Sequence, residues 1–169
     1  MSNSFDYLIE PLGSHHNRAA FACGVEPLDV YLKRQAGQDA RKRVAAPFVL
    51  LDQSSGIVAG YYTLSAIGIN TVELPTEVAK KLPKYPIVPA TLLGRLAVDK
   101  NYQGKKLGEI LLMDALHRSL RSEIASMAVV VDAKDERARA FYEHYHFIRF
   151  PDYSHRLFLL MKTIAKLFE

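Results

Sequence analysis

The residues between positions 98 and 108 combine glycines and lysines in an order that suits the binding of an anion. The segment joins an apolar run expected to form a strand to another expected to form a helix. The first amides of a helix have no partner within it and carry the positive end of its dipole. Gly104 and Gly108 let a bulky ligand approach the backbone, and Lys105 and Lys106 add positive charge. These features predict a phosphate or pyrophosphate site.

Two common phosphate-binding motifs are absent from this loop. A P-loop requires G-x-x-x-x-G-K-[ST] and a dinucleotide fingerprint requires G-x-G-x-x-G, and the segment matches neither pattern. An ordinary glycine-containing turn between a strand and a helix is therefore the alternative interpretation.

The histidines and the cysteine point to structure rather than to chemistry. His15-His16, His144 and His146 lack metal-ligand spacing with carboxylates or cysteines, so no metal site is expected. Cys23 is the single cysteine, which excludes an intramolecular disulfide and fits a reducing compartment. No positive residue adjoins it in the sequence, and we expect it to be a small packed residue rather than a nucleophile.

Hydrophobic periodicity and turn residues indicate the elements that must position these groups. Ser54-Ser55-Gly56 is expected to close a hairpin, and Thr76 and Asp135 are expected to cap helices. Early antiparallel strands followed by a strand–helix–strand–helix unit predict an α/β (α+β) fold with a mixed central sheet and helices on both faces. Strands are expected at Leu8–Ile9, Phe48–Leu51, Ile57–Ile69, Thr91–Val98, Ala128–Val131 and Leu157–Met161, and helices at Glu26–Gln38, Thr76–Leu82, Leu107–Leu120 and Glu136–His144.

Length and composition favour one soluble domain over residues 1–169. The chain has 169 residues, of which 49% are hydrophobic and 24% charged, as in an average globular domain. The first residues lack the pattern of a secretory signal, and the uncharged stretch at 53–72 is too polar for a membrane span. We therefore expect a cytoplasmic protein without a membrane segment.

Several segments together resemble a known enzyme family. Gly94-Arg95-Leu96-Ala97-Val98-Asp99 followed by Gln103-Gly104-Lys105-Lys106-Leu107-Gly108 resembles motif A of the GNAT acetyltransferases, in which Gln/Arg-x-x-Gly-x-Gly/Ala holds the pyrophosphate of acetyl-coenzyme A (acetyl-CoA). The likeness extends over nearly the whole chain. Tyr61-Tyr62-Thr63-Leu64-Ser65-Ala66, Leu82-Pro83-Lys84-Tyr85-Pro86, Ala133-Lys134-Asp135-Glu136 and Ala140-Phe141-Tyr142-Glu143 are similar to a narrower group, the GNAT toxins of toxin–antitoxin pairs, which acetylate the amino group of aminoacyl-tRNA.

The resemblance implies acetyl-CoA as the co-substrate and assigns it a binding site. The backbone of Leu96, Ala97 and Val98 would pair with the pantetheine arm, as an added strand does. An N–H near Ala97 or Val98 would face the thioester oxygen as an oxyanion donor. The amides of Gln103, Gly104, Lys105, Lys106, Leu107 and Gly108 would hold the pyrophosphate, and no metal is implied.

Tyr142 is the candidate general acid for the departing thiolate, as the matching tyrosine is in family members of this type. A phenol has a reference pKa near 10 and a thiol one near 8.5, so the phenol keeps its proton at neutral pH and can donate it. The α-amino group of an amino acid titrates near 7.7–8.0, and an adjacent ester lowers this further, so a strong protein base is not required. The alternative is a core aromatic, because Tyr142 shares a helical stripe with Ala138, Phe141 and Tyr145.

Basic residues are the candidates for substrate binding, in a chain whose net charge is +4. Charge runs are usually solvated surface, but clusters grouped around one cleft would hold a tRNA backbone. Arg95, on the central strand, is either a paired core residue or a residue that faces the substrate. The clusters are Lys33-Arg34, Arg41-Lys42-Arg43, Lys80-Lys81, Lys84 and Arg137 with Arg139, and Lys33, Arg34 and Arg41 are the candidate contacts beside Arg95.

Two residues depart from the family pattern. Motif A usually has glycine where this chain has Lys106, which costs backbone freedom if the position needs a positive φ. The family usually has glycine before the phenylalanine that follows the Phe-Tyr-Glu helix, and here His146 precedes Phe147. A left-handed C-cap tolerates histidine less well than glycine.

Three functions compete at this point. The first is a toxin that acetylates aminoacyl-tRNA and blocks translation. The second is a GNAT enzyme that acts on a small-molecule or protein amine, and the third is a GNAT-fold binding module that has lost catalysis, for which Lys106 is the only indication. For the first, the resemblance implies a ribbon-helix-helix antitoxin and a homodimer.

Overall fold

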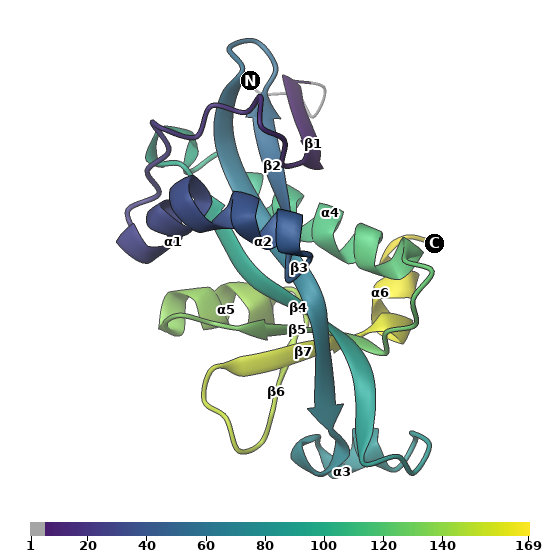
Figure 1. Cartoon of the computed structure of the whole chain (residues 1–169). Coiled ribbons are helices and arrows are strands. Elements are labelled where there is room, and N and C mark those ends of the chain that lie inside the picture. The colour runs from purple at the N-terminus through teal and green to yellow at the C-terminus, as the bar shows by residue number, and fades with distance from the viewer. Residues whose placement is uncertain (1–5) are drawn as a thin grey trace. The chain divides into compact units, whose positions relative to one another are not determined.

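The computed structural model, which describes residues 6–169, alternates strands and helices in the manner of an α/β protein. Hydrogen bonding orders the strands as β1-β2-β3-β4-β5-β7-β6 (Figure 1). The sheet is mixed, as expected, because β4 and β5 run parallel while β1–β2, β2–β3, β5–β7 and β6–β7 are antiparallel. The strands are β1 (Tyr7–Pro11), β2 (Ala46–Asp52), β3 (Ile57–Asn70), β4 (Ile87–Val98), β5 (Ala128–Asp132), β6 (Ile148–Arg149) and β7 (Arg156–Leu160). The helices are α1 (Glu26–Val30), α2 (Ala36–Lys42), α3 (Thr76–Ala79), α4 (Leu107–Arg121), α5 (Glu136–His144) and α6 (Met161–Leu167), with a π-helical turn η2 (Tyr31–Gln35) and 3-10 turns η3 (Thr71–Glu73) and η4 (Lys100–Tyr102).

The chain divides into two compact units, and each has a buried apolar cluster of its own. The first unit comprises the chain up to Ser65 together with Gly94–Ala115, and the second comprises Ala66–Leu93 with Leu116–Glu169. Strands β3 and β4 and helix α4 therefore contribute to both units. The first cluster includes Phe21, Leu32, Val49, Val58 and Tyr61, and the second includes Val88, Val130, Phe150 and Phe158.

Neighbouring tyrosines on β3 show how helices cover the sheet within the first unit. Successive side chains of a strand point to opposite faces. The Tyr61 hydroxyl donates to the carbonyl oxygen of Leu28 in α1 at 2.6 Å, whereas the Tyr62 hydroxyl donates to Asp114 Oδ2 in α4 at 2.6 Å. Helices thus pack on both faces of this part of the sheet, as the sequence predicts.

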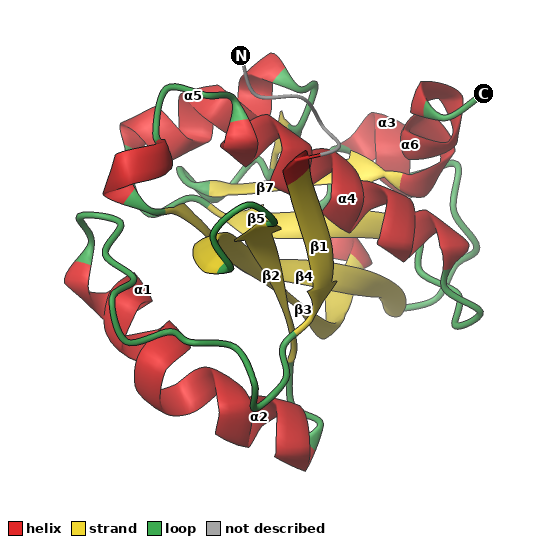
Figure 2. Cartoon of the chain, turned by 90° about the horizontal axis from the view of Figure 1, so that it is seen from above, coloured by secondary structure: helices red, strands yellow, loops and turns green. Residues whose placement is uncertain are grey.

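The first helical run is longer than predicted and contains a π-helical turn. It begins at Glu26, with a proline in its first turn as expected, and continues to Lys42 rather than ending at Gln38 (Figure 2). The amide of Ala36 donates to the carbonyl of Tyr31, five residues back instead of four. Arg43 ends the run with a left-handed φ of 59°.

Other boundaries differ from the sequence expectation in the second unit. Thr76 does not cap α3, because it is itself the first helical residue and Pro75 occupies the capping position without a side-chain bond. Met161 was expected to end a strand, but β7 stops at Leu160 and α6 begins at Met161. Neither α6 nor the short strand β6 was predicted, whereas Asp135 caps α5 as expected, with Oδ1 accepting the Ala138 amide at 2.8 Å.

Among the described residues, no helix combines the length and the apolar character that crossing a lipid bilayer requires.

Candidate active site

The loop between β4 and α4 has the backbone geometry of an anion site. Gly104 has a φ of 84° and Lys106 one of 62°, so the chain passes through the left-handed region twice before α4 begins. The carbonyl of Lys106 accepts the amide of Ile110 at 3.3 Å. The amides of Leu107, Gly108 and the next residue therefore precede the first hydrogen bond of the helix.

The surroundings of these amides leave room for a ligand. Nothing lies within 4 Å of the position that a Cβ of Gly104 would occupy. The side chains of Gln103, Lys105 and Lys106 are exposed, while Leu107 is buried and anchors the first turn of α4. The backbone here can meet a negatively charged group directly, in a loop that carries two exposed lysines.

The side chains of Asp99 and Gln103, to which the sequence analysis gave no role, hold this loop in place. Asp99 is buried, and its Oδ2 accepts the amide of Ala22 at 3.0 Å while its Oδ1 accepts the amide of Asn101 at 2.9 Å. Gln103 Nε2 donates to the carbonyls of Cys23 and Val98, both at 3.0 Å. The Gln103 side chain is thus a positioning group, because its amide nitrogen is spent on the protein backbone.

The last residues of β4 lie close to β3 within the first unit. A Cβ at Gly60 would stand only 2.9 Å from the carbonyl oxygen of Ala97, so the two backbones approach where glycine allows it. The amide of Asp99 donates to the Ala59 carbonyl at 2.8 Å. Ala97 is buried, whereas Leu96 and Val98 are half-buried.

Tyr142 belongs to the second unit, on the buried face of α5. Its ring packs against those of Phe141 and Phe147, each with centroids 5.3 Å away, and 8% of the residue is exposed. Burial raises the pKa of the Tyr142 phenol above its usual value near 10. Within the described residues no hydrogen bond of its hydroxyl is seen, and the residue as a whole keeps only a small exposed area.

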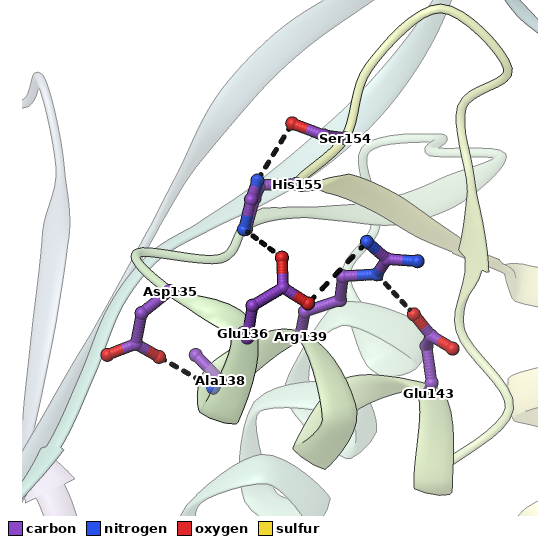
Figure 3. A network of polar contacts seen from close by, with 7 residues as sticks. All are labelled: Asp135, Glu136, Ala138, Arg139, Glu143, Ser154 and His155. Atoms are coloured by element: carbon purple, nitrogen blue, oxygen red, sulfur yellow. Dashed lines mark hydrogen bonds and ion pairs between the residues drawn. The ribbon is translucent and has the colours of Figure 1, made fainter.

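A polar network fixes the helix that carries Tyr142 (Figure 3). Glu136, in the first turn of α5, accepts from His155 Nε2 at 3.0 Å. Arg139 lies 3.7 Å from Glu136 and donates through Nε to Glu143 Oε1 at 2.6 Å. These contacts tie the first turn of α5 to His155, and the last turn of α5 to Arg139. The ring of Tyr142 is packed, as the core interpretation predicts.

The guanidinium of Arg95 lies over an aromatic ring instead of pairing with a carboxylate. Its Cζ is 3.5 Å from the centroid of the Tyr31 ring, and the residue is half-buried. The Tyr31 hydroxyl donates to Asp39 Oδ2 at 2.7 Å, and Gln35 donates to Asp39 Oδ1 at 2.9 Å. Burial, with this hydrogen bond to Asp39, raises the pKa of Tyr31 to about 12. Arg95 is thus stacked within the first unit, and it forms no ion pair with any carboxylate of residues 6–169.

Comparison with known proteins identifies the family. The model of the acetyltransferase (GNAT) family matches residues 18–147. The chain belongs to the GNAT family of acetyltransferases. This GNAT chain is 36% identical over 150 residues to the tRNA-acetylating toxin of Mycobacterium tuberculosis, covering 88% of each protein. It is also 29% identical over 170 residues to the probable toxin TacT of Sinorhizobium fredii, covering 95% of this chain and 94% of that protein.

Solved structures of GNAT toxins share the fold. AtaT complexed with acetyl-methionyl-tRNAfMet superposes with a TM-score of 0.89 at 29% identity, covering 97% of this chain and 100% of that one. AtaTR bound with AcCoA gives a TM-score of 0.85 at 28% identity, covering 98% and 99%. An AtaT mutant bound to the C-terminus of the antitoxin AtaR gives 0.82 at 26% identity, covering 96% and 98%.

Both departures from the GNAT pattern fall at left-handed positions. Lys106 has a φ of 62° and His146 one of 72°, so each stands where glycine would be relaxed. His146 follows the end of α5, and its amide donates to the Glu143 carbonyl at 3.0 Å. The strain is local, because both loops keep their backbone hydrogen bonds.

The basic clusters are only partly available for a substrate. Lys33, Arg34 and Arg41 are exposed on the helical run of the first unit, as are the two basic residues that follow Arg41. In the second unit Lys80 pairs with Glu77 at 2.9 Å, and Arg139 is engaged as described above. The first-unit cluster therefore carries the least compensated positive charge among the predicted ones.

Lys105 extends toward a cavity of about 550 Å³ within the first unit. The cavity is lined by the β2–β3 turn, the segment near Phe21 and the β4–α4 loop. The Lys105 ammonium lies 5.2 Å from the centroid of the Tyr102 ring, whose hydroxyl donates to Asp52 Oδ2 at 2.7 Å. The hydrogen bonds from Tyr102 and Ser54 lower the pKa of Asp52, so Lys105 shares the cavity with an ionised carboxylate.

In the described part of the chain, folding brings together one group of metal-type ligands that the sequence spacing did not suggest. Glu10, His15 and His16 place one ligand atom each within 4.8 Å of the others. However, His16 Nδ1 accepts the amide of Gly13 at 2.9 Å, so the proton resides on Nε2, which donates to Glu10 at 2.7 Å. Both ring nitrogens of His16 are occupied, and the group acts as a structural clamp. The buried Cys23 likewise packs in the core of the first unit, as predicted.

Proposed function

We propose that this protein is an acetyl-CoA-dependent N-acetyltransferase that modifies the α-amino group of aminoacyl-tRNA and so blocks translation as a toxin. The observation that carries the proposal is the β4–α4 loop, whose open amides and lysines suit a pyrophosphate, in a chain 36% identical to a tRNA-acetylating toxin. Residues 1–169 would act as one GNAT domain, since the family match runs through both compact units.

The residues of the loop fit acetyl-CoA. The amides of Leu107 and Gly108, the open space over Gly104 and the ammonium groups of Lys105 and Lys106 would hold its pyrophosphate. The backbone of Leu96–Val98 would pair with the pantetheine arm, and an amide there would polarise the carbonyl. When bound, acetyl-CoA supplies the acetyl group as a thioester.

Tyr142 would hold the proton that the departing sulfur needs. Its raised pKa keeps the phenol protonated across the physiological range, and Oη would deliver the proton. The attacking α-amine has a reference pKa of about 7.7–8.0, which the adjacent ester lowers further, so most of it is neutral at pH 8 without a protein base. A lysine ε-amine, near 10.4, would depend on a base far more strongly.

The acceptor would be bound through basic residues of the first unit. Lys33, Arg34 and Arg41 are exposed, and they would contact phosphates of the tRNA. Arg95, stacked on Tyr31, would face the acceptor end.

A toxin of this kind needs an inhibitor in the cell that makes it. We propose a ribbon-helix-helix antitoxin that wraps this chain, a homodimer as the working assembly, and action in the cytoplasm, where charged tRNA occurs. An AtaT mutant bound to the C-terminus of the antitoxin AtaR supports an antitoxin partner.

The test is acetylation by the purified protein. With acetyl-CoA and a panel of charged tRNAs, we expect N-acetyl-aminoacyl-tRNA, measured by mass spectrometry of the released amino acid. Robust acetylation of a polyamine or a protein amine, with none on any charged tRNA, would replace the proposal with the small-amine enzyme. Failure to bind acetyl-CoA in calorimetry, repaired by Lys106→Gly, would indicate the inactive module.

A further inference from the structure

The helical run Glu26–Lys42 contains a glycine, Gly37, beside which two arginine side chains meet. Its interior contains Gly37, a poor helix former, flanked by buried and exposed residues of good helix propensity. Two arginine side chains converge on the space that the missing Cβ leaves. Arg41 Nη1 would lie 3.3 Å from a Cβ at Gly37, and Arg18 Nη1 and Nη2 would lie 3.6 and 3.8 Å from it.

The two guanidinium groups are therefore close neighbours. Their nearest nitrogens can be no more than about 7 Å apart, a separation at which like charges repel. Neither Arg18 nor Arg41 has a carboxylate within 4.0 Å anywhere in the part of the chain that the structure describes. Two converging cations without a counter-charge form an arrangement that an anion would stabilise.

The π-helical turn binds the guanidinium of Arg18 through a backbone carbonyl. The Ala36 amide donates to the Tyr31 carbonyl, five residues back, and the Leu32 carbonyl accepts from Arg18 Nη1 at 2.9 Å. Arg18 is half-buried and comes from the segment before the helix, 23 positions from Arg41 in the sequence. The geometry is thus built by the fold and is not a consequence of neighbouring positions in a charge run.

The chemistry of the pair selects a phosphate. Guanidinium groups donate N–H bonds of about 2.7–2.9 Å to phosphate oxygens, and nitrogens no more than about 7 Å apart are close enough for one phosphate to accept from both. Five exposed cations lie within residues 33–43, where the single acidic residue, Asp39, already accepts from Tyr31 and Gln35. A polyanion matches this surface better than a single small anion does.

We propose that Arg18 and Arg41, converging over Gly37, form a clamp for one backbone phosphate of the tRNA acceptor. The inference rests on the proposed function and deepens it. Arg41 was expected to contact tRNA as one member of a charge run. The structure adds Arg18, which no sequence pattern marked, and assigns Gly37 the role of leaving room for both guanidinium groups.

The test separates the clamp from general electrostatic attraction. The Arg18→Gln/Arg41→Gln double variant removes the clamp, and Lys162→Gln/Lys166→Gln removes the same charge from exposed positions of α6. A third variant, Gly37→Leu, keeps every charge but fills the space between the guanidinium groups, and it should raise the thermal midpoint because leucine favours helix. For each protein, KM for charged tRNA and for acetyl-CoA is measured from 50 to 200 mM salt.

The clamp predicts that the arginine double variant and Gly37→Leu raise KM for charged tRNA on the order of tenfold at low salt, with KM for acetyl-CoA unchanged. The slope of log KM against log salt should fall by about 1 in the arginine double variant, as expected for one lost phosphate contact. The α6 double variant should keep KM within about twofold of the wild type and retain its slope.

Other outcomes overturn the clamp. An equal loss in the α6 double variant would mean steering by net charge, and a raised KM for acetyl-CoA alone would assign the phosphate to the cofactor. If the wild type acetylates no charged tRNA, the proposed function falls, and anisotropy with labelled deacylated tRNA then decides the clamp. Binding that the arginine double variant and Gly37→Leu weaken would retain it, whereas absent or unchanged binding would remove it.

Discussion

Replacing Tyr142 by phenylalanine separates its two roles, because it deletes one oxygen and leaves the ring. The ring contacts with Phe141 and Phe147, at 5.3 Å each, do not involve the hydroxyl, which has no hydrogen-bond partner among the described residues. We therefore expect Tyr142→Phe to change the free energy of unfolding by no more than about 0.5 kcal/mol. Loss of a general acid should lower kcat about 100- to 10,000-fold, which corresponds to about 3–5 kcal/mol in the barrier.

The assay compares purified wild type, Tyr142→Phe and Tyr145→Phe with charged tRNA and acetyl-CoA. Tyr145→Phe is a matched control, because it removes a phenol oxygen from a ring that also packs on Phe141, at 5.2 Å. It should keep kcat within about threefold of the wild type. A Tyr142→Phe enzyme with an unchanged thermal midpoint and near-normal kcat would refute the reasoning, as would a larger loss in the control.

The pH profile gives a second readout of the same acid. A general acid works while protonated, and the raised pKa of Tyr142 extends its protonated range upward from the usual value near 10. Wild-type kcat/KM should therefore rise as the α-amine loses its proton, up to about pH 8, and then stay level toward pH 10. A fall in rate between pH 8 and 9 in the wild type, absent in Tyr142→Phe, would contradict the raised pKa.

Three further outcomes follow from the contacts described above. Asp99→Ala should lower the free energy of unfolding in urea by about 3 kcal/mol, because it strips the buried acceptor from the amides of Ala22 and Asn101, and a change below about 1 kcal/mol would contradict this. His146→Gly should raise stability by about 1 kcal/mol by relaxing a φ of 72°, and a lower thermal midpoint would argue against strain there. The raised pKa of Tyr31 favours folding below the unfolded value of 10.0, so this contribution should be lost as pH rises toward about 12, and Tyr31→Phe should flatten that part of the stability profile.

Periodicity was sufficient for the elements whose side chains meet near neighbours in the sequence. The hairpin of β2 and β3, helix α4 and the Asp135 cap of α5 all depend on residues a few positions apart, and they were predicted within a few residues. Helix α6 was missed because the apolar residues of β7 continue directly into it, so hydrophobicity alone does not mark the junction at Met161.

The parts of the site that were not predictable depend on distant segments. Asp99 meets the Ala22 amide across 77 positions, and Gln103 meets Cys23 across 80, so no local pattern signals either bond. The bond from Arg18 to the Leu32 carbonyl in the π-helical turn is likewise not predictable, because a run of basic residues in the sequence does not indicate which backbone carbonyl a distant arginine meets. The predicted catalytic role of Tyr142 came from the resemblance to the GNAT family, because the apolar stripe that it shares on its helix indicates only a core residue.

Lys106 is unfavourable for the folded loop but favourable for binding an anion. Its φ of 62° is unfavourable for a side chain with a Cβ, and an ammonium beside the first turn of α4 has the wrong sign for the helix dipole. The loop does not need Lys106 for its own conformation, because the side chains of Asp99 and Gln103 already hold its backbone. The backbone strain and the unfavourable charge of Lys106 are therefore not explained by folding. A bound pyrophosphate would offset the repulsion between the Lys106 ammonium and the positive end of the helix dipole, because both would then face the same negative charge. This is the pattern expected where local strain is retained for a ligand and not for the fold.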